Sequence, residues 1–597
     1  MSVLIYQIGR LEKGMEPINF NIKKNLEDEE GIKIKSVLSS FALKKYMLEY
    51  EEKKQVKVIL AFPVSIPFNR NLVEKRISNK NIEEKNVIDK NIIDKNLINK
   101  NMANKNMPND ESGLPEELRE KIKEIIEDEK EREKYFDNPK DFFSFHPHTK
   151  EADDFIVLHS IGKFSGIDFD TDITDIILEI FLDMIKRVNQ LENIKLERKD
   201  LNIDDSSNLE KNIQDNKVNI FIDISSGHNI YVSALIEAAR NLSNYYNLLH
   251  YFDSNKIQVN LLFSDPVFSK EETYDIHKSY IMEQNISFSS PLNSDQIKQK
   301  KIASDIYKEK IHEIDINNLL SDRYFYLNDE QDLGNLKDEK KKNLDISTKE
   351  FFVSQRKKEI NFLLEKFGIL FSALKNGIPL SLFSFSIPDE KIVFNCINDI
   401  VTTGSLFLSK NYLNSNQINY QSYIKVLSSL ALMISIIKML NEKNIHKDEE
   451  VSYSKLSELF VDKKTSIFNI LKNEYARLLI SNELLTYKKP NKYADNKSVF
   501  ERTNNHWQIL DKSMPFRNDY KNDTKHNDIN SNNSDKNSDK DIVKNKKTLE
   551  NINPRHFLAH AGFERNIVEV KKEGKELYFR YRKDALDRVK SILLDEI

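Results

Sequence analysis

Residues 218–229 read VNIFIDISSGHN, and this stretch decides the fold of the first half of the chain. An almost unbroken apolar run is typical of a strand that is buried on both faces of a parallel sheet. The run ends in Asp223, small polar residues and Gly227, and a helical pattern begins near Ile230. The stretch therefore predicts a strand, a turn and a helix, which form one step of a β–α–β fold.

Four more apolar runs of this kind lie in the first 270 residues: Val3–Gly9, Val56–Ile66, Phe155–Gly162 and Ile257–Val267. Helical patterns lie between the runs, at Ser36–Tyr46, Ile173–Val188 and Ile230–Leu249. The alternation of strands and helices predicts an α/β, Rossmann-like domain with a parallel sheet and helices on both faces. We place this domain at residues 1–270.

Two low-complexity tracts interrupt the patterns. Residues 71–105 repeat a pentapeptide of the NIIDK type, and a period of five fits neither a helix nor a strand. We interpret 71–150 as an insertion in the α/β domain, with an exposed helix at Pro115–Lys134. Residues 518–547 are rich in Asn, Asp, Ser and Lys, so we expect disorder there.

The pattern becomes helical from about residue 350 onward. Apolar residues recur at spacings of three and four in Phe351–Lys375, Tyr420–Leu440, Tyr453–Phe460 and Thr465–Leu485. Alternation around Glu573-Gly574 predicts a hairpin, and Asp584–Leu594 predicts a final helix. We therefore expect a mainly α domain with a small hairpin at 351–597, preceded by a helical linker at 271–350.

Composition excludes several classes of protein. The 91 basic and 95 acidic residues give a net charge of -4, so any contact with nucleic acid must be local. The single cysteine, Cys396, excludes a disulfide framework and a cysteine metal site. The start of the chain lacks the pattern of a signal peptide, and the longest apolar stretch, Leu427–Leu440, predicts a buried helix. We expect a cytoplasmic protein with no membrane partner.

The first candidate site lies at the predicted strand ends. Ligands bind open parallel sheets outside the carboxyl ends of the strands. Small and polar residues at a helix N-terminus favour phosphate, and Gly227 would let a ligand approach the backbone closely. We expect Asp223 to bond loop amides. The candidate ligand-binding residues are Gly9, Arg10, Gly162, Lys163, Ser225, Ser226, Gly227, His228 and Asn229.

Alternatives for this first site stay open. Any strand-to-helix turn needs a glycine and small polar residues, and Arg10 and Lys163 could equally be solvated surface residues. The chain has neither G-x-G-x-x-G nor G-x-x-x-x-G-K-[ST], which argues against a standard dinucleotide site or a P-loop.

The second candidate site is the segment NINPRHFLAHAGFE at residues 551–564. Pro554 suits the first position of a helix, which places Arg555 and His560 near one another. An arginine can stabilise the charge on a phosphodiester, and a histidine can move a proton near neutral pH. Such a pair would let RNA be cleaved by its own 2′-hydroxyl without a metal. The alternative is an arginine in a salt bridge and a histidine on a helix face.

These segments resemble a known family. Asn553–Glu564 looks like the R-x-x-x-x-H motif of HEPN ribonuclease domains in CRISPR-associated CARF–HEPN proteins. Asp223–Asn229 looks like the D-x-[ST]-H-G-x-N strand-end motif of their CARF domains. Phe155–Phe169, Leu261–Pro266 and Phe371–Leu382 resemble further segments of the family. The resemblance to this family extends over most of the chain outside the two low-complexity tracts.

Two residues depart from the family's motifs. Ser226 stands where the strand-end motif usually has histidine, and His228 follows two positions later. His556 stands where the catalytic motif often has asparagine, so its role does not carry over.

The resemblance implies a mechanism. A dimer of CARF domains would bind a cyclic oligoadenylate, expected to be cyclic tetra-adenylate, made by a type III CRISPR effector complex. Binding would reshape a HEPN dimer, in which two Arg555/His560 pairs cleave single-stranded RNA without a metal or other cofactor. A cyclic ligand of even length suits the two-fold axis of a homodimer.

Two other functions compete with this one. The chain could be a non-catalytic nucleotide sensor that controls a helical interaction module, for instance in transcription; a winged-helix reader with a basic helix would favour that function, and none is evident. A Rossmann-type oxidoreductase would need the dinucleotide fingerprint that is absent.

Overall fold

The computed structural model describes residues 2–9, 17–23, 31–51, 53, 55–69, 115–200, 218–253, 257–265, 272–280, 286–306, 346–409, 412–414, 418–448, 450–489, 497–514 and 552–597. The pentapeptide repeat at 71–105, the tract at 518–547 and Arg10 lie outside these residues, so the predictions made for them stay predictions.

An eight-stranded mixed sheet forms the N-terminal part, with the strand order β3-β2-β10-β9-β8-β1-β4-β5. The strands are β1 (Ser2–Ile8), β2 (Ile18–Ile22), β3 (Ile32–Ser36), β4 (Gln55–Pro63), β5 (Asp154–Leu158), β8 (Val218–Asp223), β9 (Gln258–Ser264) and β10 (Thr273–Tyr280). The five predicted strands are β1, β4, β5, β8 and β9, and they pair with one another in parallel. In the centre of the sheet, Tyr6 of β1 pairs with Ile59 and Ile222. The predicted α/β core is confirmed.

Three strands correct the prediction of a purely parallel sheet. β10 runs antiparallel to β9 and parallel to β2, and β2 runs antiparallel to β3. The region expected to open a helical linker at 271 therefore continues the sheet as far as Tyr280. In β10 the buried Tyr274 and Ile276 alternate with polar residues. Because these strands are only half-buried, they lack the continuous apolar run that reveals the central ones.

Helices cover both faces of the sheet. α7 (Ile173–Asp200) and α9 (Asn229–Leu249) pack on one face. The opposite face carries α1 (Ser39–Glu49), η1 (Ile66–Phe68), α3 (Glu116–Glu127), α4 (Glu129–Asp137), α5 (Pro139–Ser144) and α6 (Pro147–Glu151). The two-stranded sheet of β6 (Gly162–Phe164) and β7 (Ile167–Phe169) follows β5.

The expected exposed helix at 115–134 is wrong in two respects. It is two helices, α3 and α4, and the apolar side of α3 is buried. The side chains that α3 buries are Leu118, Ile122 and Ile125. Residues 115–151 are thus a packed part of the domain rather than low-complexity insertion.

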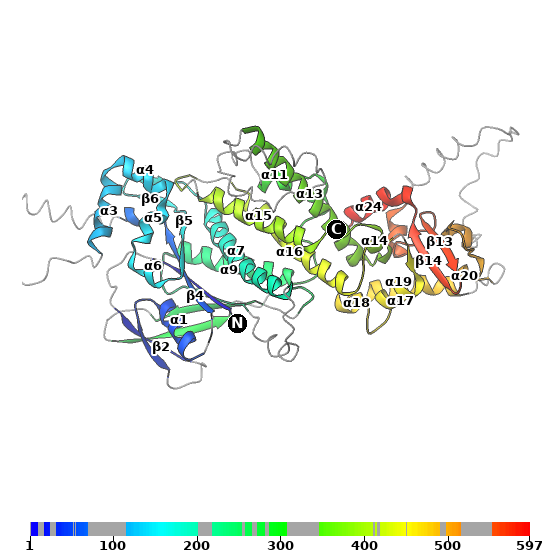
Figure 1. Ribbon diagram of the computed structural model, residues 1–597, viewed down its shortest axis with the longest axis horizontal. Helices are drawn as coiled ribbons and strands as arrows, with labels where there is room; N and C mark the ends of the chain where they lie inside the picture. Colours follow the sequence, from blue (N-terminus) through cyan, green and yellow to red (C-terminus); the bar gives the residue numbers. More distant parts are fainter. Residues whose placement is uncertain are drawn as a thin grey trace, which may run out of the picture.

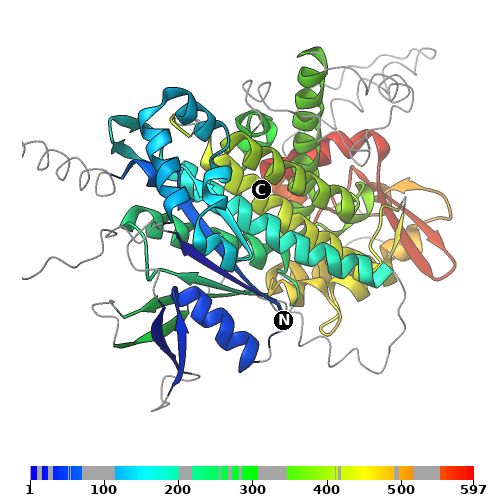
Figure 2. The same ribbon diagram turned by 60° about the vertical axis from the view of Figure 1, so that its left-hand side comes forward.

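A layer of long helices lies against α7 and α9 (Figure 1). These helices are α13 (Ile346–Asn376), α15 (Glu390–Leu408) and α16 (Tyr420–Glu442), with the short α10 (Ser294–Lys298), α11 (Ile302–Ile306) and α14 (Pro379–Ser384) beside α13. α15, which the apolar pattern did not reveal, packs on α7, and α16 packs on α9. Figure 2 shows α7 between the sheet and this layer.

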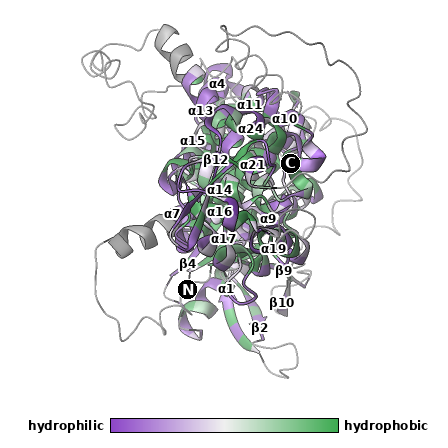
Figure 3. Cartoon of the chain, turned by 90° about the vertical axis from the view of Figure 1, so that its right-hand side faces the viewer, coloured by the Kyte–Doolittle hydropathy of each residue, from purple (hydrophilic) through white to green (hydrophobic). Residues whose placement is uncertain are grey.

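α16 is long and apolar enough to cross a membrane by length and composition, but 83% of its most apolar window is buried inside the protein. It contains the stretch Leu427–Leu440, so the prediction of a buried helix is confirmed. Figure 3 shows hydrophobic segments gathered in the middle of the molecule, around α14, α16 and α9.

The C-terminal end adds a four-stranded sheet with the order β11-β14-β13-β12. The predicted hairpin is β13 (Val568–Glu573) and β14 (Glu576–Tyr581); β11 (Val451–Ser452) and β12 (Gln508–Ile509) flank it. Its helices are α17 (Tyr453–Phe460), α18 (Ile467–Ile470), α19 (Glu474–Lys488), α20 (Val499–Arg502), α21 (Leu510–Ser513), α23 (Pro554–Ala559), η8 (Lys583–Ala585) and α24 (Leu586–Asp595). The helix expected at 465–485 is broken into α18 and α19 at Lys472, whose φ is 53°.

Candidate functional site

The short helix α23 positions Arg555. Asn553 precedes the helix, and its side-chain oxygen accepts a hydrogen bond from the backbone N–H of Arg555 at 2.9 Å. Pro554 occupies the first turn, where a missing N–H costs nothing. Phe557 is fully buried against the ring of Tyr581, while Arg555 is exposed. The apolar residue thus anchors the helix and leaves the arginine at the surface.

His560 ends α23 at a tight turn. The backbone carbonyl of His560 accepts a hydrogen bond from the N–H of Phe563 at 2.8 Å, and the next two residues, Ala561 and Gly562, have positive φ. Both of these residues are buried. Arg555 and His560 therefore belong to one rigid helix–turn unit.

A carboxylate from another helix holds the His560 ring. Nδ1 of His560 lies 3.1 Å from Oε2 of Glu483, which is on α19. This hydrogen bond raises the pKa of His560 above its ordinary value. Because a carboxylate only accepts, Nδ1 carries a proton and Nε2 is turned away from Glu483. His560 is thus held as a proton-transfer group with its second nitrogen available.

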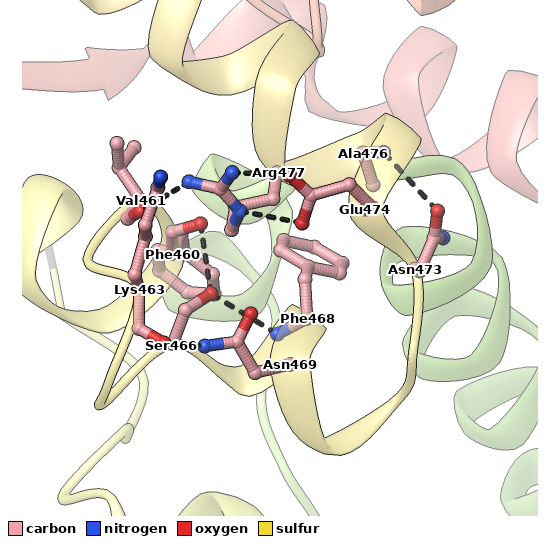
Figure 4. A network of polar contacts seen from close by, with 10 residues as sticks. All are labelled: Phe460, Val461, Lys463, Ser466, Phe468, Asn469, Asn473, Glu474, Ala476 and Arg477. Atoms are coloured by element: carbon pink, nitrogen blue, oxygen red, sulfur yellow. Dashed lines mark hydrogen bonds and ion pairs between the residues drawn. The ribbon is translucent and has the colours of Figure 1, made fainter.

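Interactions at the start of α19 fix its position (Figure 4). Asn473 caps the helix by accepting from the N–H of Ala476 at 3.1 Å. The buried Arg477 is ion-paired with Glu474 and donates to the carbonyl of Val461 at 3.0 Å. These contacts tie α19 to the preceding loop, so Glu483 projects from an ordered helix.

Two arginines of this region have no charged partner in the described residues. Among the residues that the structure describes, no ion pair or side-chain hydrogen bond engages Arg555 or Arg565. Arg565 is close enough for its charge to oppose the rise in the pKa of His560. Unpaired arginines beside a histidine favour a phosphodiester. His556 is exposed on α23.

The sequence did not reveal Glu483 or Arg565. Glu483 is 77 residues from His560, and nothing in its helix distinguishes it from Glu474. Arg565 is nearer, five positions after His560, and its nearness to the motif is the one feature that could have indicated it.

The carboxyl ends of β1 and β8 lie at the point where the strand order of the sheet reverses. On one side of β1 lie β4 and β5, and on the other side lie β8 and β9. Such a switch point is where open α/β sheets bind ligands. Gly9 and the segment Ser225–Asn229 follow these two strands, so they flank the expected pocket. Gly9 itself is buried, and its N–H donates to the carbonyl of Ala61 at 2.8 Å.

Ser225 and Ser226 turn toward the protein. The hydroxyl of Ser226 is buried, donates to the carbonyl of Ile8 at 2.9 Å and accepts from Nε2 of Gln7 at 3.1 Å. The hydroxyl of Ser225 accepts from the N–H of Ser264 at 2.8 Å. Both hydroxyls are therefore engaged in hydrogen bonds that join the ends of β1, β8 and β9.

Asp223 has the structural role expected from its place in the sequence. Its Oδ1 accepts from the N–H of Ser225 at 2.9 Å, and its Oδ2 accepts from the hydroxyl of Ser39 at 2.6 Å. It is fully buried, so it fixes the loop rather than facing a ligand.

The exposed residues of the strand-end loop are Gly227, His228 and Asn229. Gly227 has a φ of +110°, and a Cβ there would stand 2.8 Å from Cβ of Ile8, so only glycine fits. His228 and Asn229 begin the 21-residue helix α9. Of the five predicted residues in this loop, these three are the ones placed to meet a ligand.

The loop after β5 lies at the same edge. Tyr231, in the first turn of α9, hydrogen-bonds with Ser65, Ser160 and the backbone of Ile161, which lie beyond the ends of β4 and β5. Gly162 and Lys163 are exposed in β6, where Lys163 pairs with Asp168 at 3.1 Å. The structure thus brings the predicted residues of the second loop to the same edge, with the lysine charge partly balanced.

Within the described residues, no group of three or more His, Cys, Asp or Glu side chains is arranged to hold a metal ion.

Two family models match the chain. The first, described as the CARF domain of the CRISPR system endoribonuclease Csx1, matches residues 3–266, and the second, described as the HEPN domain of the same endoribonuclease, matches residues 470–583. The first match covers the strand-end loops, and the second covers Glu483 and His560. No curated protein matches the chain.

Proposed function

Because the chain belongs to the CRISPR-associated CARF–HEPN ribonuclease family, we propose that it is a metal-independent endoribonuclease that a cyclic oligoadenylate activates. The family makes it an endoribonuclease that senses a ligand. The observation that carries the finer proposal is His560, held through Nδ1 by Glu483 beside arginines without ion pairs. Such a site can bind a phosphodiester and move a proton.

The chemistry needs only the RNA and these side chains. The 2′-oxygen attacks the adjacent phosphorus, a P–O2′ bond forms and the P–O5′ bond breaks. The 2′-hydroxyl proton passes to a base, and the 5′-oxygen takes a proton from an acid such as protonated His560. Arg555 and Arg565 balance the charge that develops on the phosphate. The products are a 2′,3′-cyclic phosphate and a 5′-hydroxyl.

A homodimer would supply both proton-transfer groups. Two His560/Arg555 pairs facing one another across a two-fold axis would provide one neutral imidazole as base and one protonated imidazole as acid. Single-stranded RNA suits this site, because its backbone is free to adopt the in-line geometry that the attack requires.

The activator would bind at the switch point of the sheet. We assign its phosphates to the exposed loop at Gly227–Asn229 and the N-terminus of α9, with Gly162 and Lys163 at the next loop. Cyclic tetra-adenylate fits a two-fold site, and a type III CRISPR effector complex in the cytoplasm would supply it. It activates by binding one state of the dimer more tightly than the other.

An RNA cleavage assay tests the proposal. We expect cleavage to persist in EDTA, to rise with one member of a panel of cyclic oligoadenylates, and to leave 2′,3′-cyclic phosphate ends. His560→Ala and Arg555→Ala should each lower the stimulated rate by about 10²- to 10⁴-fold. Full stimulated cleavage by the His560→Ala protein would refute the catalytic assignment. Ligand-dependent DNA binding without RNA cleavage would favour a non-catalytic sensor.

A further inference from the structure

We propose that Glu483 is the positioning residue for His560: it fixes the ring so that Nε2, and not Nδ1, exchanges the proton with the RNA, while Tyr487 holds the Glu483 carboxylate in place. This inference rests on the proposed function and adds to it a residue outside the R-x-x-x-x-H motif.

Each oxygen of the Glu483 carboxylate has its own partner, the His560 ring for one and Tyr487 for the other. Oε2 lies 3.1 Å from Nδ1 of His560, and Oε1 accepts a hydrogen bond from the hydroxyl of Tyr487 at 2.8 Å. The Glu483 side chain is 13% exposed, whereas the His560 side chain is 45% exposed. The glutamate therefore approaches from the protein side, and the histidine keeps its other side open to solvent and substrate.

Tyr487 anchors this arrangement. The side chain is fully buried, and its ring packs 5.9 Å from Phe563 and 5.5 Å from Phe579, measured between centroids. Phe563 follows the turn after His560, and Phe579 lies in β14. Tyr487 thus links the glutamate to the turn that carries the histidine, so the two side chains are held on one packed unit.

The charges around His560 come from three elements. Glu483 and Tyr487 project from α19, Arg555 and His556 from α23, and Glu564 and Arg565 from the segment after the turn. The hydrogen bond to Glu483 is the largest cause of the raised pKa of His560, and the charges of Glu483 and Glu564 add to it. Desolvation and the charge of Arg565 oppose it. Neutralising Glu483 should therefore lower the pKa of His560.

The test compares Glu483→Gln with a control at an exposed glutamate, Glu458→Gln. Glu458 is on α17, and no described side chain forms an ion pair with it. For the Glu483→Gln protein, we expect the His560 pKa, read from the ¹³C-labelled imidazole by NMR, to fall. The limb of the cleavage pH profile assigned to His560 should move to lower pH by the same amount. The change in kcat should be a loss of about 10- to 100-fold, with KM little changed.

Further variants separate positioning from folding. Of the 12 histidines, the NMR signal of His560 is the one that is absent in His560→Ala. Tyr487→Phe keeps the packed ring but removes the hydroxyl, so kcat should fall less than in Glu483→Gln. The Glu458→Gln protein should keep the wild-type pKa, pH profile and kcat.

An unchanged His560 pKa and pH profile in Glu483→Gln would overturn the inference, even if kcat fell. Failure of the proposed function is distinguishable: if His560→Ala still cleaved RNA, the catalytic assignment would fail, while the NMR titration would still decide whether Glu483 controls His560.

Discussion

Arg565 is a second cation near His560 that lies outside the R-x-x-x-x-H motif. No described residue forms an ion pair with it, and its charge opposes the rise in the pKa of His560. Such an arginine should contact an RNA phosphate. Arg565→Ala should weaken binding of an RNA with 2′-deoxy substitution at the cleaved position, and should reduce the slope of log K against log salt by roughly 0.7. Fluorescence anisotropy over a salt series measures both.

Arg240→Ala is the matched control for Arg565→Ala. Arg240 is exposed on α9 and already paired with Glu237 at 2.7 Å, so its loss should leave the slope unchanged. Equal slopes for wild type and Arg565→Ala would show that Arg565 does not contact the RNA backbone.

At the scale of residues, the sequence reveals a candidate site when the residues of that site lie in one short segment. Arg555 and His560 could be proposed from the sequence because they share a short helix and the turn after it. Glu483 reaches His560 only through tertiary packing, and a glutamate on an amphipathic helix has no local mark. Ser226 shows the opposite case. It lies in the strand-end motif, but its hydroxyl is hydrogen-bonded to Gln7 and Ile8. Buried polar groups at the end of a strand need such partners inside the protein.

At the scale of elements, the turn from α13 to α14 supports α19. Gly377 has a φ of +68°, and a Cβ there would stand 2.7 Å from Cβ of Ala476, in the first turn of α19. Gly377→Ala should combine backbone strain with a steric clash and lower the free energy of unfolding by about 2–4 kcal/mol. Chemical denaturation measures this loss.

Gly574→Ala separates the two contributions. Gly574 also has a positive φ, +59°, but nothing lies within 4 Å of its would-be Cβ. Gly574→Ala should therefore lower the free energy of unfolding only by the backbone strain, about 1–2 kcal/mol. An equal loss in both variants would mean that the contact of Gly377 with α19 does not add to the strain.

Elements were predictable to different degrees. The buried strands β1, β4, β5, β8 and β9 follow from continuous apolar runs. The half-buried β2, β3 and β10 do not, because charged and polar residues alternate along them. A single predicted helix at 465–485 became α18 and α19, because Lys472 takes a left-handed conformation that hydrophobic spacing does not encode.

At the scale of the whole molecule, the sensing and cleaving parts share one apolar core. A single cluster of buried residues includes Ile222 of β8, Phe181 of α7, Leu430 of α16 and Phe579 of β14. The expected linker at 271–350 therefore does not separate two independent bodies in the described residues, because α15 and α16 pack directly on α7 and α9. A change at the strand ends can reach the C-terminal part through packed helices.

Tyr412 and Leu413, between α15 and α16, contact the loops that follow β5. Tyr412 is buried with its ring 5.0 Å from the His159 ring, and the carbonyl of Leu413 accepts from the N–H of Asp170 at 2.9 Å. His159 follows β5, and its Nδ1 lies 2.6 Å from Oε1 of Glu179 on α7. Tyr412 thus joins the loop beside the expected activator pocket to the helices that lead to the cleavage site.

We therefore expect Tyr412→Leu to weaken the coupling between activator and cleavage. Leucine keeps most of the apolar volume but removes the aromatic contact with His159. The ratio of stimulated to unstimulated cleavage should fall by roughly 2- to 30-fold, the range for residues that transmit coupling. Activator affinity and unstimulated cleavage should change little, and Tyr50→Leu, at the exposed residue that follows α1, should keep the wild-type ratio. If Tyr412→Leu kept the wild-type ratio as well, the activation signal would have to travel through other contacts, such as those of α9 with α16.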